Sequence, residues 1–225
     1  MKRILIRDCP KFVGRKVKVC GWVNSRRDHG KLIFINLRDR SGILQTVFRV
    51  RDVSQSVSQL AQKLKPEWVI CLEGVVERRP KGTENLEIST GGIELTAEDL
   101  KIISETEKEL PLDLTKKELK VKLSTLLKER ALTLRHERNR AIFKVFETVI
   151  QSYQETMRKS DFTEIKTPKI IGTASEGGAN FFTLDYFGKK AYLAQSPQFY
   201  KQICVGAFER VFEIASVFRK ERHFT

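Results

Sequence analysis

The amino-acid sequence predicts a multi-domain protein, with an all-β domain in its first half and an α+β domain in its second. Three observations support this division. Residues 15–104 alternate apolar and polar side chains with a period of two, as half-buried strands do. Residues 138–159 instead repeat apolar side chains with the helical period of 3.6. Residues 105–130 are strongly charged, which is typical of a linker, so we predict domains at 1–104 and 131–225.

Five segments of the first domain are predicted to be strands. A helix is expected between the third and fourth strands, at residues 54–64, where Val57, Leu60 and Leu64 keep helical spacing. The resulting order of strand, strand, strand, helix, strand, strand is that of the OB-fold, a barrel often used to bind oligonucleotides. The predicted strands are residues 15–27, 31–42, 43–50, 68–80 and 86–104.

The second domain mixes helices and strands. After the amphipathic helix at 138–159, a short strand ends at Pro168, and residues 181–195 form a hairpin that turns at 187–189. Ser196 is a good N-cap and Pro197 a good first helical residue, so a helix is expected there. A last strand is predicted from residue 208 onward. This order indicates an α+β domain with an antiparallel sheet, which ends without a closing element.

The charge of the chain is concentrated near its start. The net charge is +14, and residues 1–50 contribute +10 of it, with thirteen Lys and Arg against three Asp and Glu. Such an excess favours a polyanionic partner, because neutralising phosphates releases counterions. A solvated, solubilising surface would have the same composition, so charge alone leaves both interpretations open.

Composition also argues against several classes of protein. No apolar run approaches the roughly 20 residues needed to span a bilayer, and the first residues lack the apolar segment of a signal peptide. We therefore expect a cytoplasmic protein with no membrane partner. The cysteines are widely spaced, without a CxxC pair, which argues against zinc and predicts free thiols in a reducing compartment. They are Cys9, Cys20, Cys71 and Cys204.

An aromatic side chain lies among cations on the predicted barrel strands. If Ile33 and Ile35 face the core, then Phe34 faces outward, because side chains alternate along a strand. Arg27, Arg38 and Gln45 accompany it. Bases stack on aromatic rings while Arg and Gln reach phosphates and base edges, so this pattern favours nucleic-acid binding over a core role for the phenylalanine.

Residues 20–48 (CGWVNSRRDHGKLIFINLRDRSGILQTVF) resemble the anticodon-binding barrel of class IIb aminoacyl-tRNA synthetases, the aspartate, asparagine and lysine group. The resemblance implies that Phe34 stacks on an anticodon base. It also implies that Arg27, Gln45 and Glu94 contact anticodon nucleotides.

Residues 212–225 (FEIASVFRKERHFT) resemble motif 2 of class II synthetases. That likeness implies that Arg219 is catalytic and holds both the α-phosphate of ATP and the amino-acid carboxylate, where it opposes charge in the transition state. Glu221 would accept hydrogen bonds from the adenine amino group. Taken without the resemblance, an Arg-x-Glu pattern in a strand is more typical of a cross-strand ion pair.

The helix at 138–159 and the strand ending at Pro168 resemble motif 1 of the same class. The resemblance implies a homodimer whose interface includes Pro168. Periodicity by itself would indicate only a core helix packed on a strand.

Two further segments resemble the aspartate-binding parts of aspartyl-tRNA synthetases of the archaeal and eukaryotic type: residues 195–202 (QSPQFYKQ) and the mobile loop at 173–180 (TASEGGAN). By this resemblance, aspartate is bound by Glu176, Gln195, Ser196, Gln198, Lys201 and Arg219. Lys201 would attract the side-chain carboxylate, and Glu176 the α-ammonium group. Lys201 and Gln198 are three residues apart, which places both on one helix face. Without the resemblance, ordinary surface roles would be favoured for both charged residues.

The family's activity follows as an expectation. Its members activate L-aspartate with ATP and Mg²⁺ to aspartyl-adenylate, and transfer it to tRNA(Asp); some also charge tRNA(Asn), which the sequence leaves open. The asparagine enzyme is an alternative, although it typically has Ser-Gly-Gln where this chain has Gln195–Gln198.

The resemblance stops before the family's catalytic domain is complete. Motif 3, the acidic Mg²⁺ ligands and a second arginine for the aspartate side chain are expected beyond residue 225, and no metal ligand is expected within the chain. The 225 residues by themselves are therefore expected to be inactive. The alternative from another class is a truncated module that binds tRNA or other single strands without catalysis.

Overall fold

The computed structural model describes residues 1–173 and 181–220. The chain divides into two compact units, Met1–His136 and Glu137–Thr225, each with its own strands and helices. Among the residues described, no helix is both long enough and apolar enough to cross a membrane.

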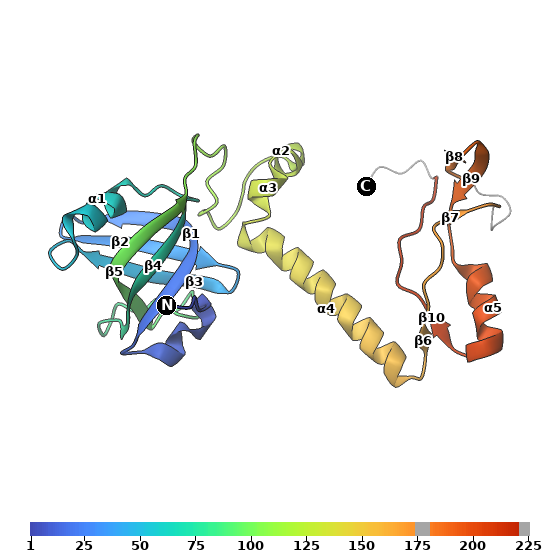
Figure 1. The fold of residues 1–225 in the computed structure, drawn as a ribbon, viewed down its shortest axis with the longest axis horizontal. Helices are drawn as coiled ribbons and strands as arrows, with labels where there is room; N and C mark the ends of the chain where they lie inside the picture. Colours follow the sequence, from blue (N-terminus) through green and yellow to red (C-terminus); the bar gives the residue numbers. More distant parts are fainter. Residues whose placement is uncertain (174–180, 221–225) are drawn as a thin grey trace. The chain divides into compact units, whose positions relative to one another are not determined.

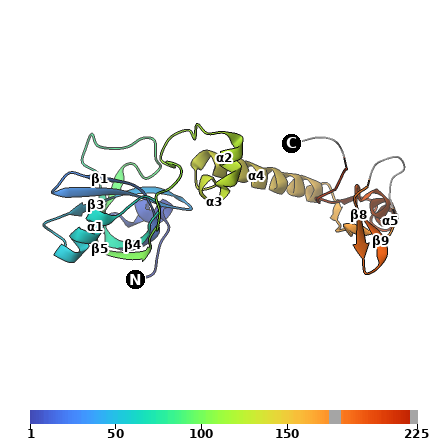
Figure 2. The same ribbon diagram turned by 90° about the horizontal axis from the view of Figure 1, so that it is seen from above.

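The first unit is built on a closed barrel whose strands lie in the order β1-β2-β3-β5-β4. Neighbouring strands are antiparallel except β3 and β5, which are parallel. Figures 1 and 2 show the strands wrapping around a common interior. The predicted OB-fold is confirmed. The strands are β1 (Lys16–Asp28), β2 (Leu32–Asp39), β3 (Gly42–Arg49), β4 (Val69–Arg78) and β5 (Ile93–Ser104), and a 3₁₀-helix, η1 (Ile6–Phe12), precedes them.

Alternation along the strands decides which side chains fill the barrel. Ile33 and Ile35 are fully buried, whereas Phe34 is half-buried on the outer face, as expected. On the neighbouring strand β3, Leu44 and Phe48 are likewise buried. These side chains belong to one continuous apolar core, which also includes Ile6, Val19, Val23, Leu37, Ile70, Leu72, Val76 and Leu95.

The predicted helix between the third and fourth strands is α1 (Gln55–Lys63). It begins after Ser54, whose hydroxyl oxygen accepts a hydrogen bond from the backbone N–H of Val57 at 3.3 Å. This side-chain cap satisfies a donor that the first turn leaves without a helical partner. Its buried residues, Val57 and Ala61 among them, face the barrel core.

The cysteines differ from the prediction of free thiols. Cys20 and Cys71 lie directly opposite each other on β1 and β4, with 4.0 Å between their Cα atoms, and form a disulfide. The prediction was wrong because the two residues are 51 positions apart and meet only through the register of the barrel. Cys9 and Cys204 are free, and burial raises the pKa of Cys9 to about 12, with the charges of Asp39 and Asp8 adding to the shift.

The segment after β5 folds back onto the barrel. Trp68 donates its indole N–H to the Thr106 hydroxyl at 3.0 Å. Near the other end of the segment, the Arg135 guanidinium donates to the buried Glu67 carboxylate at 2.8 Å. Residues 105–136 therefore belong to the first unit by their packing. The segment includes two short helices, α2 (Leu123–Lys128) and α3 (Arg130–Thr133).

The second unit combines a long helix with two small sheets, as the α+β prediction requires (Figure 1). β6 and β10 form a parallel pair, and β7, β9 and β8 form an antiparallel sheet in that order. The predicted hairpin is β8–β9, with Phe187 and Gly188 at its turn. The elements are α4 (Glu137–Lys159), β6 (Thr163–Glu164), β7 (Ile170–Ile171), β8 (Thr183–Tyr186), β9 (Lys189–Leu193), α5 (Gln198–Phe208) and β10 (Val211–Phe212).

The apolar side chains of α4 lie at the surface of this unit. The structure describes all of residues 137–159, and none of their side chains is buried. Yet the helix is amphipathic, so one exposed face is apolar. That face includes Ile142, Phe143, Val145, Phe146, Val149 and Tyr153.

Two local predictions in the second unit need correction. Pro197 is the cap of α5 rather than its first residue, and the Ser196 hydroxyl accepts from the Gln198 N–H at 3.2 Å. The strand predicted from residue 208 onward is limited to Val211–Phe212 in the described part of the chain. Alternation favours an extended backbone, but a strand also needs a ladder partner, which alternation cannot supply.

Candidate functional site

A cavity of about 500 Å³ opens on the outer face of the barrel. Its walls come from β1, β2, β3 and the start of β5, and from the loop that joins β4 to β5. All four residues predicted to contact an anticodon, Arg27, Phe34, Gln45 and Glu94, line it, so the structure brings them together. The other lining residues are His29, Leu32, Val47, Arg49, Arg79, Pro80, Thr83 and Asn85.

Arg27, Gln45 and Glu94, from β1, β3 and β5, are joined by two consecutive hydrogen bonds. The Arg27 guanidinium donates to Gln45 Oε1 at 3.2 Å, and Gln45 Nε2 donates to Glu94 Oε2 at 2.9 Å. Glu94 is 7% exposed, which makes its carboxylate a fixed acceptor. Because both ends of the amide have partners, its orientation is set, and its second N–H and second lone pair remain for a ligand.

Phe34 presents a ring at the wall of the cavity. The Arg27 guanidinium carbon lies 5.9 Å from the ring centroid, and the His29 ring meets it edge-on at 5.8 Å. These contacts restrain the ring, so a base can stack on it without first ordering it.

Arg79 is a residue of this cavity that sequence reasoning missed. It is 8% exposed and donates to the carbonyl oxygens of Ile93 and Thr83 at 3.1 and 3.2 Å. Burial lowers the pKa of Arg79, while the charge of Glu94 opposes that shift. Arg79 therefore ties the β4–β5 loop to the start of β5. An arginine directly before Pro80 carries no local signal of burial.

Arg38 does not belong to the cavity, although the sequence placed it with Arg27 and Gln45. It is 7% exposed and makes two hydrogen bonds to the carboxylate of Glu67, at 2.7 and 2.9 Å. Alternation put it on the outer face, but the 29-residue separation from Glu67 hid the partner. Arg38 thus forms a structural ion pair with Glu67. Its guanidinium carbon lies 6.0 Å from the centroid of the Trp22 ring.

In the second unit, a pair of backbone hydrogen bonds centres on Ala194. Its N–H donates to Lys169 O at 2.9 Å, and its carbonyl oxygen accepts from the Phe218 N–H at 3.0 Å. The residues that follow, Gln195 and Arg219, therefore lie on neighbouring stretches of backbone. Gln195 is 3% exposed, whereas Arg219 is at the surface.

The remaining predicted aspartate contacts lie near the start of α5. Ser196 precedes the helix, Gln198 is its first residue and is exposed, and Lys201 is half-buried one turn later. Two predicted contacts, Glu176 and Glu221, lie outside the described residues.

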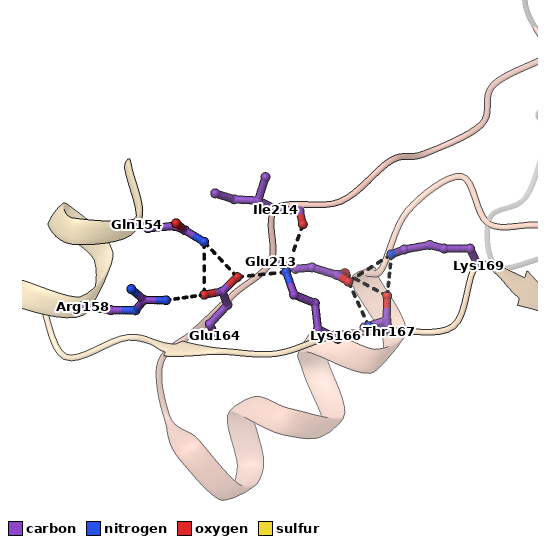
Figure 3. A network of polar contacts seen from close by, with 8 residues as sticks. All are labelled: Gln154, Arg158, Glu164, Lys166, Thr167, Lys169, Glu213 and Ile214. Atoms are coloured by element: carbon purple, nitrogen blue, oxygen red, sulfur yellow. Dashed lines mark hydrogen bonds and ion pairs between the residues drawn. The ribbon is translucent and has the colours of Figure 1, made fainter. Parts of the chain in front are cut away.

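The buried carboxylate of Glu213 contacts Thr167 and Lys169, the residues on either side of Pro168 in the sequence (Figure 3). Glu213, directly after β10, accepts from the Thr167 N–H at 2.9 Å, the Thr167 hydroxyl at 2.8 Å and Lys169 Nζ at 3.1 Å. Burial by itself raises the pKa of Glu213, but the hydrogen bonds from Thr167 and Lys169 outweigh it and hold the pKa below its ordinary value. This carboxylate was not predicted, because its partners precede it by more than forty residues.

Comparisons with known proteins agree with both units. A family model described as tRNA synthetases class II (D, K and N) matches residues 122–225, and one for the OB-fold nucleic acid binding domain matches residues 17–103. The chain is 43% identical over 217 residues to an aspartate–tRNA(Asp/Asn) ligase of Archaeoglobus fulgidus, covering 96% of this chain and 49% of the relative. It is 44% identical over 213 residues to an aspartate–tRNA(Asp) ligase of Pyrococcus horikoshii, covering 94% and 47%.

The fold also matches a solved structure. The asparaginyl-tRNA synthetase of Pyrococcus horikoshii, in complex with asparaginyl-adenylate, superposes with a TM-score of 0.87 at 32% identity. The match covers all of this chain and 50% of that one. The chain thus spans about half the length of the curated relatives it matches.

Proposed function

The chain belongs to the class II tRNA synthetases (D, K and N), and from this premise we propose that the whole protein is an aspartate–tRNA ligase. A carboxylate oxygen of L-aspartate attacks the α-phosphorus of ATP, and pyrophosphate leaves. A hydroxyl at the tRNA 3′ end then attacks the aspartyl carbonyl carbon, and AMP leaves. Catalysis rests on orientation and on positive charge near the reacting phosphorus rather than on acid–base groups.

The observation that carries this proposal is the Phe218–Ala194 backbone hydrogen bond, which joins the two segments that include Arg219 and Gln195. Arg219 holds the α-phosphate and the carboxylate of aspartate at the point where the new bond forms. Gln195, Ser196 and Gln198 orient the amino acid from the other side. Lys201 binds its side-chain carboxylate.

Two roles in the proposal belong to residues outside the described ranges. Glu176 attracts the α-ammonium group of aspartate, and Glu221 accepts from the adenine amino group. ATP brings Mg²⁺, but residues 1–173 and 181–220 contain no cluster of three His, Cys, Asp or Glu side chains that could hold a metal ion.

The barrel cavity binds the anticodon loop. Phe34 stacks on a base, and Arg27 binds phosphates of the RNA backbone. The Gln45 amide, oriented by Glu94, forms hydrogen bonds with a base edge. The relatives carry both names, aspartate–tRNA(Asp) ligase and aspartate–tRNA(Asp/Asn) ligase, so tRNA(Asn) is the second substrate to test.

The protein acts in the cytoplasm as a homodimer. The exposed apolar face of α4 supports this, because an apolar surface of that kind is stabilised by a partner. Pro168, which follows β6, lies at the interface.

The test is amino-acid-dependent ATP–pyrophosphate exchange by the whole protein, followed by charging of tRNA(Asp) and tRNA(Asn) transcripts. We expect exchange with aspartate and none with asparagine. Exchange with asparagine alone would make the protein an asparagine enzyme instead.

A binding module without catalysis is the second candidate. It is favoured by one observation: the barrel is closed, and its cavity is complete within Met1–His136. RNA stem-loop binding with no exchange for any amino acid would support this candidate.

A further inference from the structure

The parallel pairing of β6 and β10 has a regular repeat of hydrogen bonds that stops before Thr167. The N–H groups of Thr163 and Ile165 donate to the carbonyl oxygens of Arg210 and Phe212, at 2.9 and 3.0 Å. Donors and acceptors thus advance two residues at a time, as in any parallel ladder. The next pair would join the N–H of residue 167 to the carbonyl of residue 214.

The Glu213 side chain replaces this next ladder bond (Figure 3). Its carboxylate accepts the Thr167 N–H, while the Ile214 carbonyl oxygen instead accepts from Lys166 Nζ at 3.2 Å. Both backbone groups are therefore satisfied by side chains at the point where the two strands separate.

Separation at this point sends the chain toward Ala194. Residues 214–217 leave the neighbourhood of β6, and the Phe218 N–H donates to Ala194 O. That hydrogen bond joins the backbone directly before Arg219 to the backbone directly before Gln195. The residue at which β10 separates from β6 therefore determines how many residues span the distance from β6 to Arg219.

We propose that Glu213 is the positioning residue for Arg219, because its carboxylate fixes where the chain leaves β6. The proposal rests on the proposed function only for its effect on catalysis. Glu213 contacts no substrate; it acts through Thr167, Lys169 and the backbone that follows it.

Glu213 differs from a carboxylate in an ordinary surface ion pair because its side chain is buried. Its side chain is 1% exposed, whereas that of Glu164, the other carboxylate in Figure 3, is 17% exposed and pairs with the exposed cations Arg158 and Lys166. Removing Glu213 leaves the Thr167 N–H without its acceptor and takes the carboxylate away from the Lys169 ammonium, which keeps the Thr167 hydroxyl as an acceptor. Loss of a buried acceptor of this kind is costly. Removing the Glu164 charge leaves cations that water can solvate.

The experiment compares Glu213→Ala and the isosteric Glu213→Gln with the matched control Glu164→Gln in the whole protein. Hydrogen exchange of the backbone is measured for peptides covering 213–219. Aspartate-dependent ATP–pyrophosphate exchange is measured per folded molecule, well below the melting temperature. We expect faster hydrogen exchange in Glu213→Ala, at least a ten-fold fall in kcat and a raised KM for ATP. Glu213→Gln, which keeps one acceptor oxygen, is intermediate, and the control stays within two-fold of the wild type.

The two readouts separate the possible failures. Unchanged protection of residues 213–219 in both Glu213 variants would overturn the positioning role, whatever the activity. Wild-type kcat and KM in variants that only melt earlier would also overturn it, because the role would then be purely structural. If the wild type shows no exchange with aspartate, the proposed function fails, and the hydrogen-exchange comparison still decides the role of Glu213.

Discussion

Single residues of this chain gain their roles from fixed partners. Phe34 is restrained by Arg27 and His29, and the Gln45 amide is oriented by Glu94. In each case the side chain that we propose as a ligand contact is already ordered, which would lower the entropy cost of binding.

Phe34 is the residue through which RNA binding is tested most directly. Loss of one base–aromatic stack costs about 1–3 kcal/mol, so Phe34→Ala should weaken binding of a stem-loop with the aspartate anticodon by roughly ten-fold or more. Fluorescence anisotropy measures this change. The matched control is Phe187→Ala, which removes another exposed ring, 90% accessible, from the second unit. Equal affinity for the wild type and Phe34→Ala would refute the stacking role.

Glu213 also predicts a dependence of stability on pH. Its folded-state pKa lies below the ordinary value of 4.5, so its stabilising contribution is present above pH 4.5 and is lost as the pH falls through the lowered pKa. Glu213→Gln cannot titrate. The gap in unfolding free energy between the wild type and this variant should therefore narrow from pH 6 to pH 3 in urea melts. A gap that stays constant over this range would contradict the assigned pKa direction.

At the scale of elements, the barrel depends on close approach between strands. Gly74 lies at an irregularity in the β4–β5 pairing, and a Cβ atom there would overlap the Thr96 carbonyl oxygen and lie 2.8 Å from Ala97 Cα. Both are backbone atoms, which cannot rotate away.

Gly74→Ala should therefore destabilise the barrel by about 1–3 kcal/mol or more. Gly92→Ala is the matched control, because a Cβ there meets nothing within 4 Å. Urea unfolding, followed by tryptophan fluorescence, measures both variants. Equal midpoints would show that the strands can separate at no cost, contrary to this account.

The helices and strands also show which structural features period-two alternation can predict and which it cannot. Period-two alternation predicted the barrel strands and the outward position of Phe34, since it depends only on neighbouring residues. The same alternation extended the last strand through residue 225, whereas the described part is a strand only at Val211–Phe212. Alternation reports an extended backbone and says nothing about whether a partner strand lies beside it.

At the scale of the whole molecule, the exposed apolar face of α4 is the surface that we propose for the homodimer interface. If it forms the homodimer interface, Phe146→Lys in the whole protein should shift the dimer to monomer, because a charge cannot be buried there without a partner. Gln151→Lys adds the same charge on the opposite face of the helix and should leave the dimer intact. Sedimentation velocity distinguishes the two. Dissociation by both variants, or by neither, would argue against this interface.

The sequence by itself determined the order of the elements, the outer face of the barrel and the family, because periodicity and motifs are local properties. Only the tertiary structure decided which distant residues meet: Cys20 with Cys71, Arg38 with Glu67, and Thr167 with Glu213. Each pair depends on strand register or on the path of a loop. These are set by the packing of the whole unit, so no stretch of sequence encodes them alone.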